Sequence, residues 1–312
     1  MEGCMKTAVI TGATGTIGRA LIDVCIEAGY EVMAIVHRNS LRVLDLENIE
    51  HCHVLNLNLA EYNNALEEIQ KQNIVLGDYA FFFHLAWMAP FGKDRENLPL
   101  QLQNVQDSLA AVHFAKALGC SVFIGAGSQA EYGRVEGKLA PDTPTFPETG
   151  YGIAKLSAGQ MTRLACEQVG LKHIWTRILS VYGPYDREQT LISTAINDMM
   201  NNKETSFTPC NQIWDYIYSK DASRAMLLAA QKGKHGDVYV IGSGEAHPLK
   251  EYIQKIAEIT GYKKEIGFGK RLYNEKQVMY LQADIKQLQE IGFEVKVPFE
   301  DGIKRIIAMK KQ

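Results

Sequence analysis

Residues 6–18 read KTAVITGATGTIG, a short apolar run followed at once by three glycines spaced three residues apart. An apolar run of this length predicts a strand buried on both faces, and the helical spacing that follows predicts a helix directly after it. In such a unit the first glycine permits a tight turn, the second lets a phosphate approach the backbone, and the third lets the helix pack on the strand. The stretch therefore predicts a dinucleotide-binding loop. Its expected contacts with the cofactor are Gly12, Thr14, Gly15, Thr16, Ile17 and Gly18.

The same alternation of strands and helices continues along the chain. The pattern predicts strands at 6–11, 31–36, 53–57, 79–85, 121–125, 173–179 and 237–241, and helices at 17–28, 62–71, 105–118, 151–169 and 248–260. Such alternation predicts an α/β fold, a doubly wound parallel Rossmann sheet with a smaller C-terminal substrate-binding lobe. We expect residues 1–180 to form the NAD(P)-binding domain, with 215–245 returning to it. Residues 181–214 and 246–312 are expected to form the lobe.

Composition excludes several classes of protein. The 312 residues include 33 Lys and Arg against 36 Asp and Glu, a net charge of −3, which gives no electrostatic case for nucleic acid or an anionic membrane. Six cysteines occur without any Cys-x-x-Cys spacing, so neither a disulfide framework nor a metal site is predicted. The first residues lack the pattern of a signal peptide, and no stretch is long and apolar enough to span a bilayer. We expect a cytoplasmic protein.

The end of the second predicted strand distinguishes between the two nicotinamide cofactors. An acidic residue usually stands there to bind the ribose 2′-hydroxyl of NAD, but residues 36–40 read VHRNS. Arg38 is suited to a bidentate pair with a 2′-phosphate, and the Ser40 hydroxyl is a further donor. The sequence therefore favours NADP, with NAD as the alternative.

A second motif carries proton chemistry. Tyr151 and Lys155 lie four residues apart at the start of a predicted helix, which puts both side chains on one face. A nearby ammonium favours the phenolate and lowers the pKa of a tyrosine. Ser128 follows the fifth predicted strand, at the carboxyl edge where ligands of such sheets bind. Together with the glycine loop, these three residues indicate an oxidoreductase centre.

With these motifs the chain resembles the extended short-chain dehydrogenase/reductases, in particular the group of nucleotide-sugar epimerases, dehydratases and reductases. The resemblance also rests on the segments 83–86 (FHLA), 181–184 (VYGP), 214–217 (WDYI) and 299–303 (FEDGI). It implies that Tyr151 is the general acid/base, that Lys155 holds the nicotinamide ribose, and that Ser128 bonds the substrate oxygen. It also implies a homodimer formed through helices 105–118 and 151–169.

The resemblance extends the expected site to further positions. Cofactor contacts are expected from Asn58, Leu59, Leu85, Ala86 and Leu179, besides Tyr151 and Lys155. Asn58 stands where the family usually has aspartate. Substrate contacts are expected from Ser128, Gln129, Tyr151, Ser180 and Arg271. Trp214 occupies the place of a phosphate-binding arginine, which leaves Arg271 as the nearest matching cation, with a solvated surface residue as the alternative.

Three reactions share such a site. A dehydratase needs an acid/base pair directly after the serine, but here those positions hold Gln129 and Ala130, and Glu131 is expected to face elsewhere. His84 is expected to be a packed histidine rather than an acid/base group. We therefore favour an NADPH-dependent reductase of a 4-keto, 6-deoxy nucleotide sugar. The alternatives are an NAD-dependent 4-epimerase and, in a different class, a non-catalytic NADP-binding sensor or scaffold.

Overall fold

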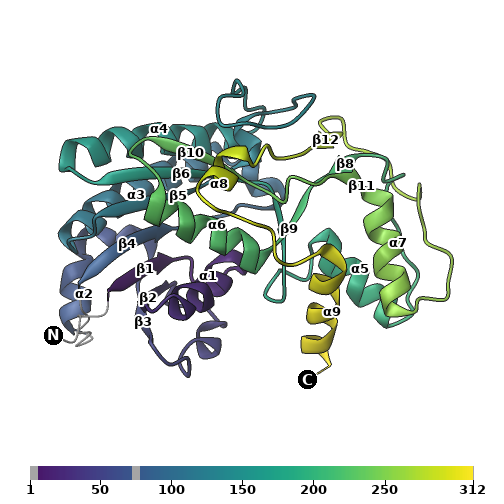
Figure 1. Ribbon diagram of the computed structural model, residues 1–312, viewed down its shortest axis with the longest axis horizontal. Helices are drawn as coiled ribbons and strands as arrows, with labels where there is room; N and C mark the ends of the chain where they lie inside the picture. The colour runs from purple at the N-terminus through teal and green to yellow at the C-terminus, as the bar shows by residue number, and fades with distance from the viewer. Residues whose placement is uncertain (1–5, 72–77, 312) are drawn as a thin grey trace.

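A seven-stranded parallel sheet forms the centre of the computed structural model, which describes residues 6–71 and 78–311 (Figure 1). Its strands, in chain order, are β1 (Thr7–Thr11), β2 (Glu31–Val36), β3 (Cys52–Asn56), β4 (Tyr79–His84), β5 (Val122–Ser128), β6 (Lys172–Ile178) and β10 (Asp237–Ile241). Their spatial order is β10-β6-β5-β4-β1-β2-β3, so the winding direction reverses between β1 and β4. This confirms the doubly wound α/β fold, and ligands of such folds bind at the reversal point.

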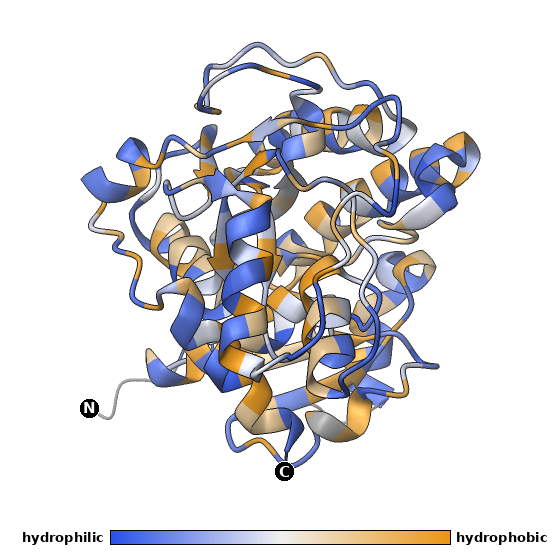
Figure 2. Ribbon diagram, turned by 90° about the vertical axis from the view of Figure 1, so that its right-hand side faces the viewer, coloured by the Kyte–Doolittle hydropathy of each residue, from blue (hydrophilic) through white to orange (hydrophobic). Residues whose placement is uncertain are grey.

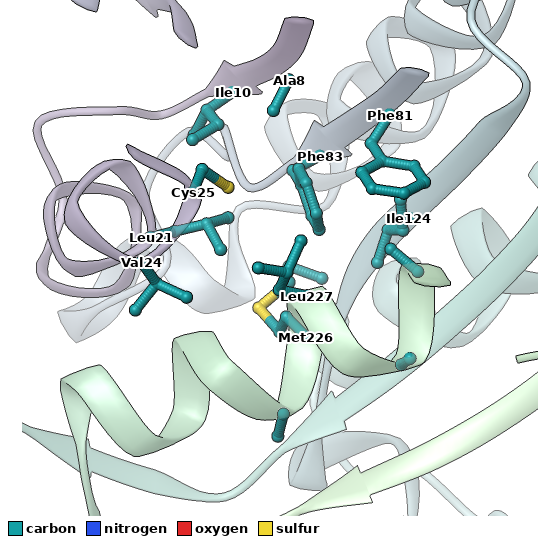
Figure 3. Close-up of a cluster of buried hydrophobic side chains, with 14 of the residues drawn as sticks. Ala8, Ile10, Leu21, Val24, Cys25, Phe81, Phe83, Ile124, Met226 and Leu227 are labelled. Atoms are coloured by element: carbon teal, nitrogen blue, oxygen red, sulfur yellow. The ribbon is translucent and has the colours of Figure 1, made fainter. Parts of the chain in front are cut away.

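Helices cover both faces of the sheet. On one face lie α1 (Thr16–Glu27) and α6 (Ser219–Lys232), and on the other lie α2 (Ala65–Lys71), α3 (Leu98–Ala117) and α4 (Gly150–Val169). Successive side chains of β4 point to opposite faces of the sheet: Phe81 and Phe83 pack with α1 and α6, while Phe82 packs on the other face. The side chains on each face form a buried apolar cluster, and Figure 3 shows the cluster that contains Phe81 and Phe83. A strand buried on both faces explains the unbroken apolar run in the sequence.

Element boundaries differ from the expected ones at places that matter for the site. Helix α3 begins at Leu98 rather than near residue 105, because the Asn97 side chain accepts a hydrogen bond from the Leu100 N–H at 3.3 Å. The expected helix at 62–71 is divided into η2 (Leu59–Asn64) and α2. Strand β5 runs to Ser128, so this serine is the last residue of the strand instead of following it.

A third apolar cluster forms the core of the smaller lobe, at the right of Figure 1. It contains α5 (Leu191–Met200), α7 (Leu249–Thr260) and α9 (Phe299–Lys310), beside the short strands β8 (Ile213–Trp214), β11 (His247–Pro248) and β12 (Tyr280–Leu281). Seen from this side, helices in the foreground carry hydrophobic residues along one side only (Figure 2). Two further strands, β7 (Ser180–Tyr182) and β9 (Tyr216–Tyr218), form a separate parallel pair.

The lobe is smaller than the range 246–312 implies. Helix α8 (Lys286–Glu290) contacts β10, and both Leu288 and Phe293 are buried in the main core against the α1/α6 face of the sheet. Residues 237–241 return to the sheet as β10, as expected. That the lobe binds the substrate stays a prediction.

Two histidines at the surface share one acidic partner. His51 and His53 both hydrogen-bond the Glu31 carboxylate, at 2.9 and 3.0 Å.

Within residues 6–71 and 78–311, no helix is both long and apolar enough to cross a membrane. Exposed apolar side chains lie on the two helices expected at a dimer interface, and they are Leu98, Leu102, Ile153, Met161 and Leu164. The dimer itself stays a prediction.

One buried indole fixes the distance between β5 and α4. Trp175 on β6 is 3% exposed and lies against three glycines. A Cβ on Gly125 would lie 2.1 Å from its Cζ3 atom, one on Gly127 2.3 Å from its Nε1, and one on Gly159 2.7 Å from its Cε2. The glycines on β5 and α4 therefore provide the space that this ring fills.

Because a methyl group at residue 125 would overlap the Trp175 ring, we expect Gly125→Ala to lower the free energy of unfolding by about 1–3 kcal/mol. Urea denaturation of the parent and the variant measures the loss. In a Trp175→Phe background the smaller ring leaves room, so the same substitution should be less destabilising there. Equal losses in both backgrounds would contradict the proposed overlap.

Candidate functional site

A cleft of about 1130 Å³ opens at the carboxyl edge of the sheet, between the reversal point and the lobe. The glycine loop and the ends of β2, β4, β5 and β6 line it, together with the start of α4. Most of the residues expected to bind cofactor or substrate meet here. They are Gly12, Thr14, Gly15, Thr16, Ile17, Gly18, Leu59, Leu85, Ala86, Ser128, Gln129, Tyr151, Lys155, Leu179 and Ser180.

The glycine loop has the close backbone approaches that its sequence predicts. Gly12 has a φ of +68°, and a Cβ there would lie 2.8 Å from the Ala86 nitrogen. The Thr11 hydroxyl accepts hydrogen bonds from the N–H groups of Leu85 and Ala86, both at 3.1 Å, which holds the end of β4 against the loop. A Cβ on Gly18 would lie 2.3 Å from the Gly12 oxygen, so α1 packs directly on the turn.

Helix α1 begins at this loop without a side-chain cap, since its N-cap residue is Gly15. The first N–H groups of a helix have no partner within the helix, and the positive end of the helix dipole lies beside them. Gly15 and Thr16 line the cleft at this point. This cradle and the volume of the cleft fit a dinucleotide, with the pyrophosphate at α1.

Ser128, Tyr151 and Lys155 converge in the cleft from two elements. Ser128 ends β5, while Tyr151 and Lys155 lie one turn apart near the start of α4. The Lys155 ammonium lies 5.8 Å from the centre of the Tyr151 ring, and Ser128 is near enough to the phenol to influence its ionisation. Burial raises the pKa of Tyr151, while Ser128 and the charge of Arg95 oppose that rise. In such an arrangement a phenol can exchange a proton with a ligand oxygen.

Lys155 has an unusual environment for a cation. It is 4% exposed, donates a hydrogen bond to the Ala126 carbonyl at 2.7 Å, and lies 3.7 Å from the centre of the Trp87 ring. Burial lowers its pKa to about 7, an effect that the negative charge of Glu131 partly opposes. The ammonium therefore titrates near neutral pH, and the Trp87 face favours its charged form.

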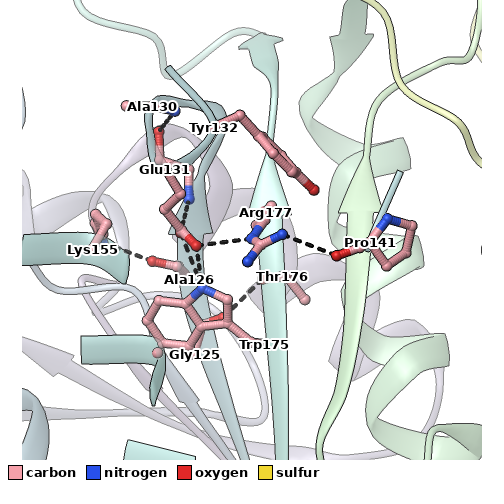
Figure 4. Close-up of polar contacts among 12 residues, drawn as sticks. Gly125, Ala126, Ala130, Glu131, Tyr132, Pro141, Lys155, Trp175, Thr176 and Arg177 are labelled. Atoms are coloured by element: carbon pink, nitrogen blue, oxygen red, sulfur yellow. Dashed lines mark hydrogen bonds and ion pairs between the residues drawn. The ribbon is translucent and has the colours of Figure 1, made fainter. Parts of the chain in front are cut away.

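Figure 4 shows Glu131 in a network of polar contacts with Arg177 and Trp175. It is fully buried, forms an ion pair with Arg177 at 2.9 Å, and accepts hydrogen bonds from the Trp175 Nε1 and the Ser128 N–H. Burial raises its pKa, and Arg177 opposes the rise. Both oxygens of Glu131 are therefore engaged by groups of the folded chain.

His84 is packed in the core, as expected, and Trp214 bonds a residue that lines the cleft. His84 is buried between the hydroxyls of Thr11 and Ser108, at 3.0 and 3.1 Å, and burial lowers its pKa to about 3. Trp214 donates its Nε1–H to the Ser180 hydroxyl at 2.8 Å. Ser180 thus lines the cleft with its oxygen already bonded from the lobe.

Three expected ligand residues lie elsewhere. The Arg38 guanidinium binds Glu61 and Glu68, at 3.0 and 2.7 Å, and Arg38 is not among the described residues that line the cleft. Asn58 caps η2 and accepts a hydrogen bond from the Arg38 N–H at 3.2 Å. Arg271 is exposed and donates to the Ser206 hydroxyl at 3.3 Å, outside the cleft. The sequence predicts that each of these three side chains binds a ligand. In the folded chain each one instead bonds a polar group of a nearby residue.

The structure adds cleft residues that sequence patterns did not single out. Arg42 follows β2 and donates to the Tyr185 carbonyl at 3.1 Å. Trp87 and Arg95 come from the loop between β4 and α3, and both contact Tyr151. An arginine in the polar run 93–96 (KDRE) carries no signal of its own, because its position depends on how the loop packs.

Comparison with known proteins places the chain in a family. The model of the NAD dependent epimerase/dehydratase family matches residues 8–242. The chain is 27% identical to the dTDP-4-dehydro-6-deoxyglucose reductase of Escherichia coli, over 98% of each chain. It is 26% identical to a putative UDP-glucose 4-epimerase of Methanocaldococcus jannaschii, over 97% of this chain and 98% of that one. Among solved structures, it resembles a UDP-glucose 4-epimerase of Thermotoga maritima with UDP-glucose, at a TM-score of 0.86 and 26% identity, covering 99% and 100% of the two chains.

The buried Lys155 predicts a pH-dependent change in stability. Its pKa falls from 10.5 in the unfolded chain to about 7 in the folded one, so below about pH 7 it is charged in both states and the folded state bears the full cost of desolvation. As pH rises above 7, the folded protein binds fewer protons than the unfolded chain. The parent therefore gains up to about 1.4 kcal/mol of stability per pH unit across that window.

Replacing Lys155 with Met removes this penalty. We expect Lys155→Met to unfold at a higher urea concentration than the parent at pH values near 6, and its advantage to shrink as the pH approaches about 10. The difference between the two proteins is the quantity to measure, since other titrating groups affect both alike. A difference that stays constant with pH would show that Lys155 titrates normally.

Proposed function

The chain belongs to the NAD dependent epimerase/dehydratase family and is an enzyme of the nucleotide-sugar-modifying type, and we propose that it catalyses the NADPH-dependent reduction of a 4-keto, 6-deoxy hexose carried on a nucleotide. The presence of the proton-transferring residues in one cleft argues against a non-catalytic sensor. The occupied Glu131 argues against a dehydratase. The similarity to the E. coli reductase over nearly the whole of both chains supports reduction.

The observation that carries the proposal lies at the end of β2. His37, Ser40 and Arg42 line the cleft there, and residues 36–44 contain no carboxylate that would repel a 2′-phosphate. Arg42 also lines a neighbouring pocket of about 220 Å³, together with the cations Arg19 and Lys310 and the carboxylates Asp186 and Glu188. The guanidinium of Arg42 and the hydroxyl of Ser40 are donors suited to a 2′-phosphate, which favours the phosphorylated cofactor.

The chain's own residues would handle the oxygen of the substrate. A nicotinamide dinucleotide bound in the cleft would supply the hydride. The Ser128 hydroxyl would donate a hydrogen bond to the carbonyl oxygen, and Tyr151 would deliver the proton as that oxygen becomes a hydroxyl. Lys155 would stabilise the phenolate that Tyr151 leaves behind, because an adjacent ammonium favours the charged form of a phenol.

A 4-epimerase is the second candidate. The similarity to the T. maritima UDP-glucose 4-epimerase favours it, since that protein matches this chain over its entire length. An epimerase returns the hydride to the sugar and retains its cofactor, whereas a reductase exchanges cofactor at every turnover. The two reactions therefore differ in whether added cofactor is consumed.

The cofactor proposal is tested with two arginines that follow the same strand. We expect Arg42→Gln to weaken NADPH binding by about tenfold or more, the effect of losing a charge-assisted hydrogen bond, and to leave NADH binding nearly unchanged. Arg38→Gln is the matched control, because Arg38 binds Glu61 and Glu68. Fluorescence titration with each cofactor gives the affinities.

If Arg38→Gln, and not Arg42→Gln, lost affinity for NADPH, the 2′-phosphate would bind at Arg38, as the sequence alone predicts. Equal affinity of the parent for NADPH and NADH would contradict the proposed preference, and with it the main support for a reductase over an epimerase.

The reaction is tested by supplying 4-keto, 6-deoxy nucleotide sugars with NADPH and following the nicotinamide absorbance. We expect oxidation of NADPH that depends on the sugar, and a rate about 10²–10⁴ lower in Tyr151→Phe, which retains the ring but lacks the proton donor. Cofactor-binding measurements on Tyr151→Phe check that the fold and cleft are intact. Interconversion of UDP-glucose and UDP-galactose with catalytic NAD, and no reduction, would promote the epimerase.

A further inference from the structure

A second cation lies against Tyr151, in addition to Lys155. Arg95, on η3 (Gly92–Glu96), has its guanidinium carbon 4.5 Å from the centre of the Tyr151 ring and lines the cleft. Its Nε is buried and, in the part of the chain that the structure describes, has no hydrogen-bond partner. Arg38, Arg134 and Arg177, in contrast, each bind a carboxylate. Among the described residues, none of the ion pairs includes Arg95.

Contacts on both sides of the loop hold Arg95 in this place. On the α3 side, Gln101 is 1% exposed and donates to the carbonyls of Ala89 and Asp94, at 3.3 and 3.0 Å. The same side chain accepts a hydrogen bond from the Trp87 Nε1 at 2.9 Å. One buried amide thus fixes the backbone before Arg95 and the indole that covers Lys155.

On the α4 side, the loop presses against the turn that carries Tyr151. The Glu96 carboxylate accepts a hydrogen bond from the Gly150 N–H at 3.1 Å. A Cβ on Gly150 would lie 3.0 Å from the Arg95 oxygen, so the backbones are in close contact there. Arg95 and Tyr151 are therefore positioned against each other by their backbones, and their contact does not depend on a flexible side chain alone.

We propose that Arg95 is a positioning residue for Tyr151, which holds the phenol ring in place and stabilises its deprotonated form with a permanent positive charge. Stacking of a guanidinium on an aromatic face is favourable in itself. A cation within about 4–6 Å of an ionisable oxygen favours the charged form of that oxygen. The proposal rests on the proposed function only in that it takes Tyr151 as the proton donor.

The charges around Tyr151 explain why a second cation matters. The groups that shift the ionisation of the phenol are Arg95 from η3, Glu131 from η4 (Gln129–Glu131) and Ser128 at the end of β5, and the Lys155 ammonium from α4 lies 5.8 Å from the centre of the ring. Glu131 and burial both oppose the phenolate. Because the pKa of Lys155 is about 7, that ammonium is only partly charged at neutral pH, whereas an arginine stays charged throughout. Of the two cations beside Tyr151, Arg95 is therefore the one whose charge does not change with pH.

The test reads the ionisation of Tyr151 directly. The absorbance of phenolate is followed as a function of pH in the parent and in Tyr151→Phe, and the difference gives the titration of this one tyrosine. The same pair is prepared in an Arg95→Met background. We expect the apparent pKa of Tyr151 to rise by about one unit or more when the guanidinium is removed.

Two further variants make the result specific. Arg95→Lys restores the charge without the planar stacking group, so it should recover part of the shift. Arg187→Met removes another cleft arginine, one that stacks on Phe91 at 4.6 Å, and should leave the titration of Tyr151 unchanged. An unchanged titration in Arg95→Met, or an equal shift in Arg187→Met, would overturn the proposal.

Turnover provides a second readout once a substrate is found. Loss of Arg95 should lower kcat and move the basic limb of the pH–rate profile upward, with little change in the KM for the cofactor. The absorbance titration needs no substrate. A failure of the proposed reaction is therefore distinguishable from a failure of the role given to Arg95.

Discussion

The buried ion pair between Glu131 and Arg177 is the interaction on which the rest of the site depends. A carboxylate taken out of water is strongly destabilising unless its oxygens are bonded, and here Arg177, the Trp175 indole and the Ser128 N–H all contribute. Because the Ser128 N–H is one of those donors, the bond that neutralises Glu131 also fixes the backbone at the end of β5. The position of the serine hydroxyl follows from the need to solvate a buried charge.

The same network determines how near the helix comes to the strand. Trp175 donates to Glu131 with its nitrogen and fills the space left by Gly125, Gly127 and Gly159 with its ring. Glycines on both β5 and α4 let the two elements approach to the thickness of one indole. Tyr151 and Lys155, on the first turns of α4, are thereby brought to Ser128. A larger side chain at any of the three glycines would overlap the Trp175 ring and push β5 and α4 away from it.

Much of this was predictable from the sequence, because the deciding patterns are local. The glycine loop, the buried strands and the four-residue spacing of Tyr151 and Lys155 each depend on neighbours within one or two elements. Arg38 was assigned to a phosphate on equally local grounds, but its partners Glu61 and Glu68 come from a later segment. The same is true of Arg271, whose side chain bonds Ser206. A long cationic side chain binds whichever acceptor the fold brings near, and short-range patterns do not contain that information.

Trp87 and Arg95 are cleft residues that short-range sequence patterns do not predict. Nothing in their own segment marks them, because their placement depends on Gln101 and Asn104, buried amides of α3 that hold the backbone of residues 88–94. The residues proposed to transfer the proton thus sit on a strand end and a helix, while the arginines proposed to act on the cofactor and on Tyr151 come from loops. Rigid elements position Ser128, Tyr151 and Lys155, whereas the loops after β2 and β4 bring Arg42 and Arg95 into the cleft. The proposed preference for NADPH rests on Arg42 and the proposed influence on Tyr151 rests on Arg95, so both depend on how these two loops pack.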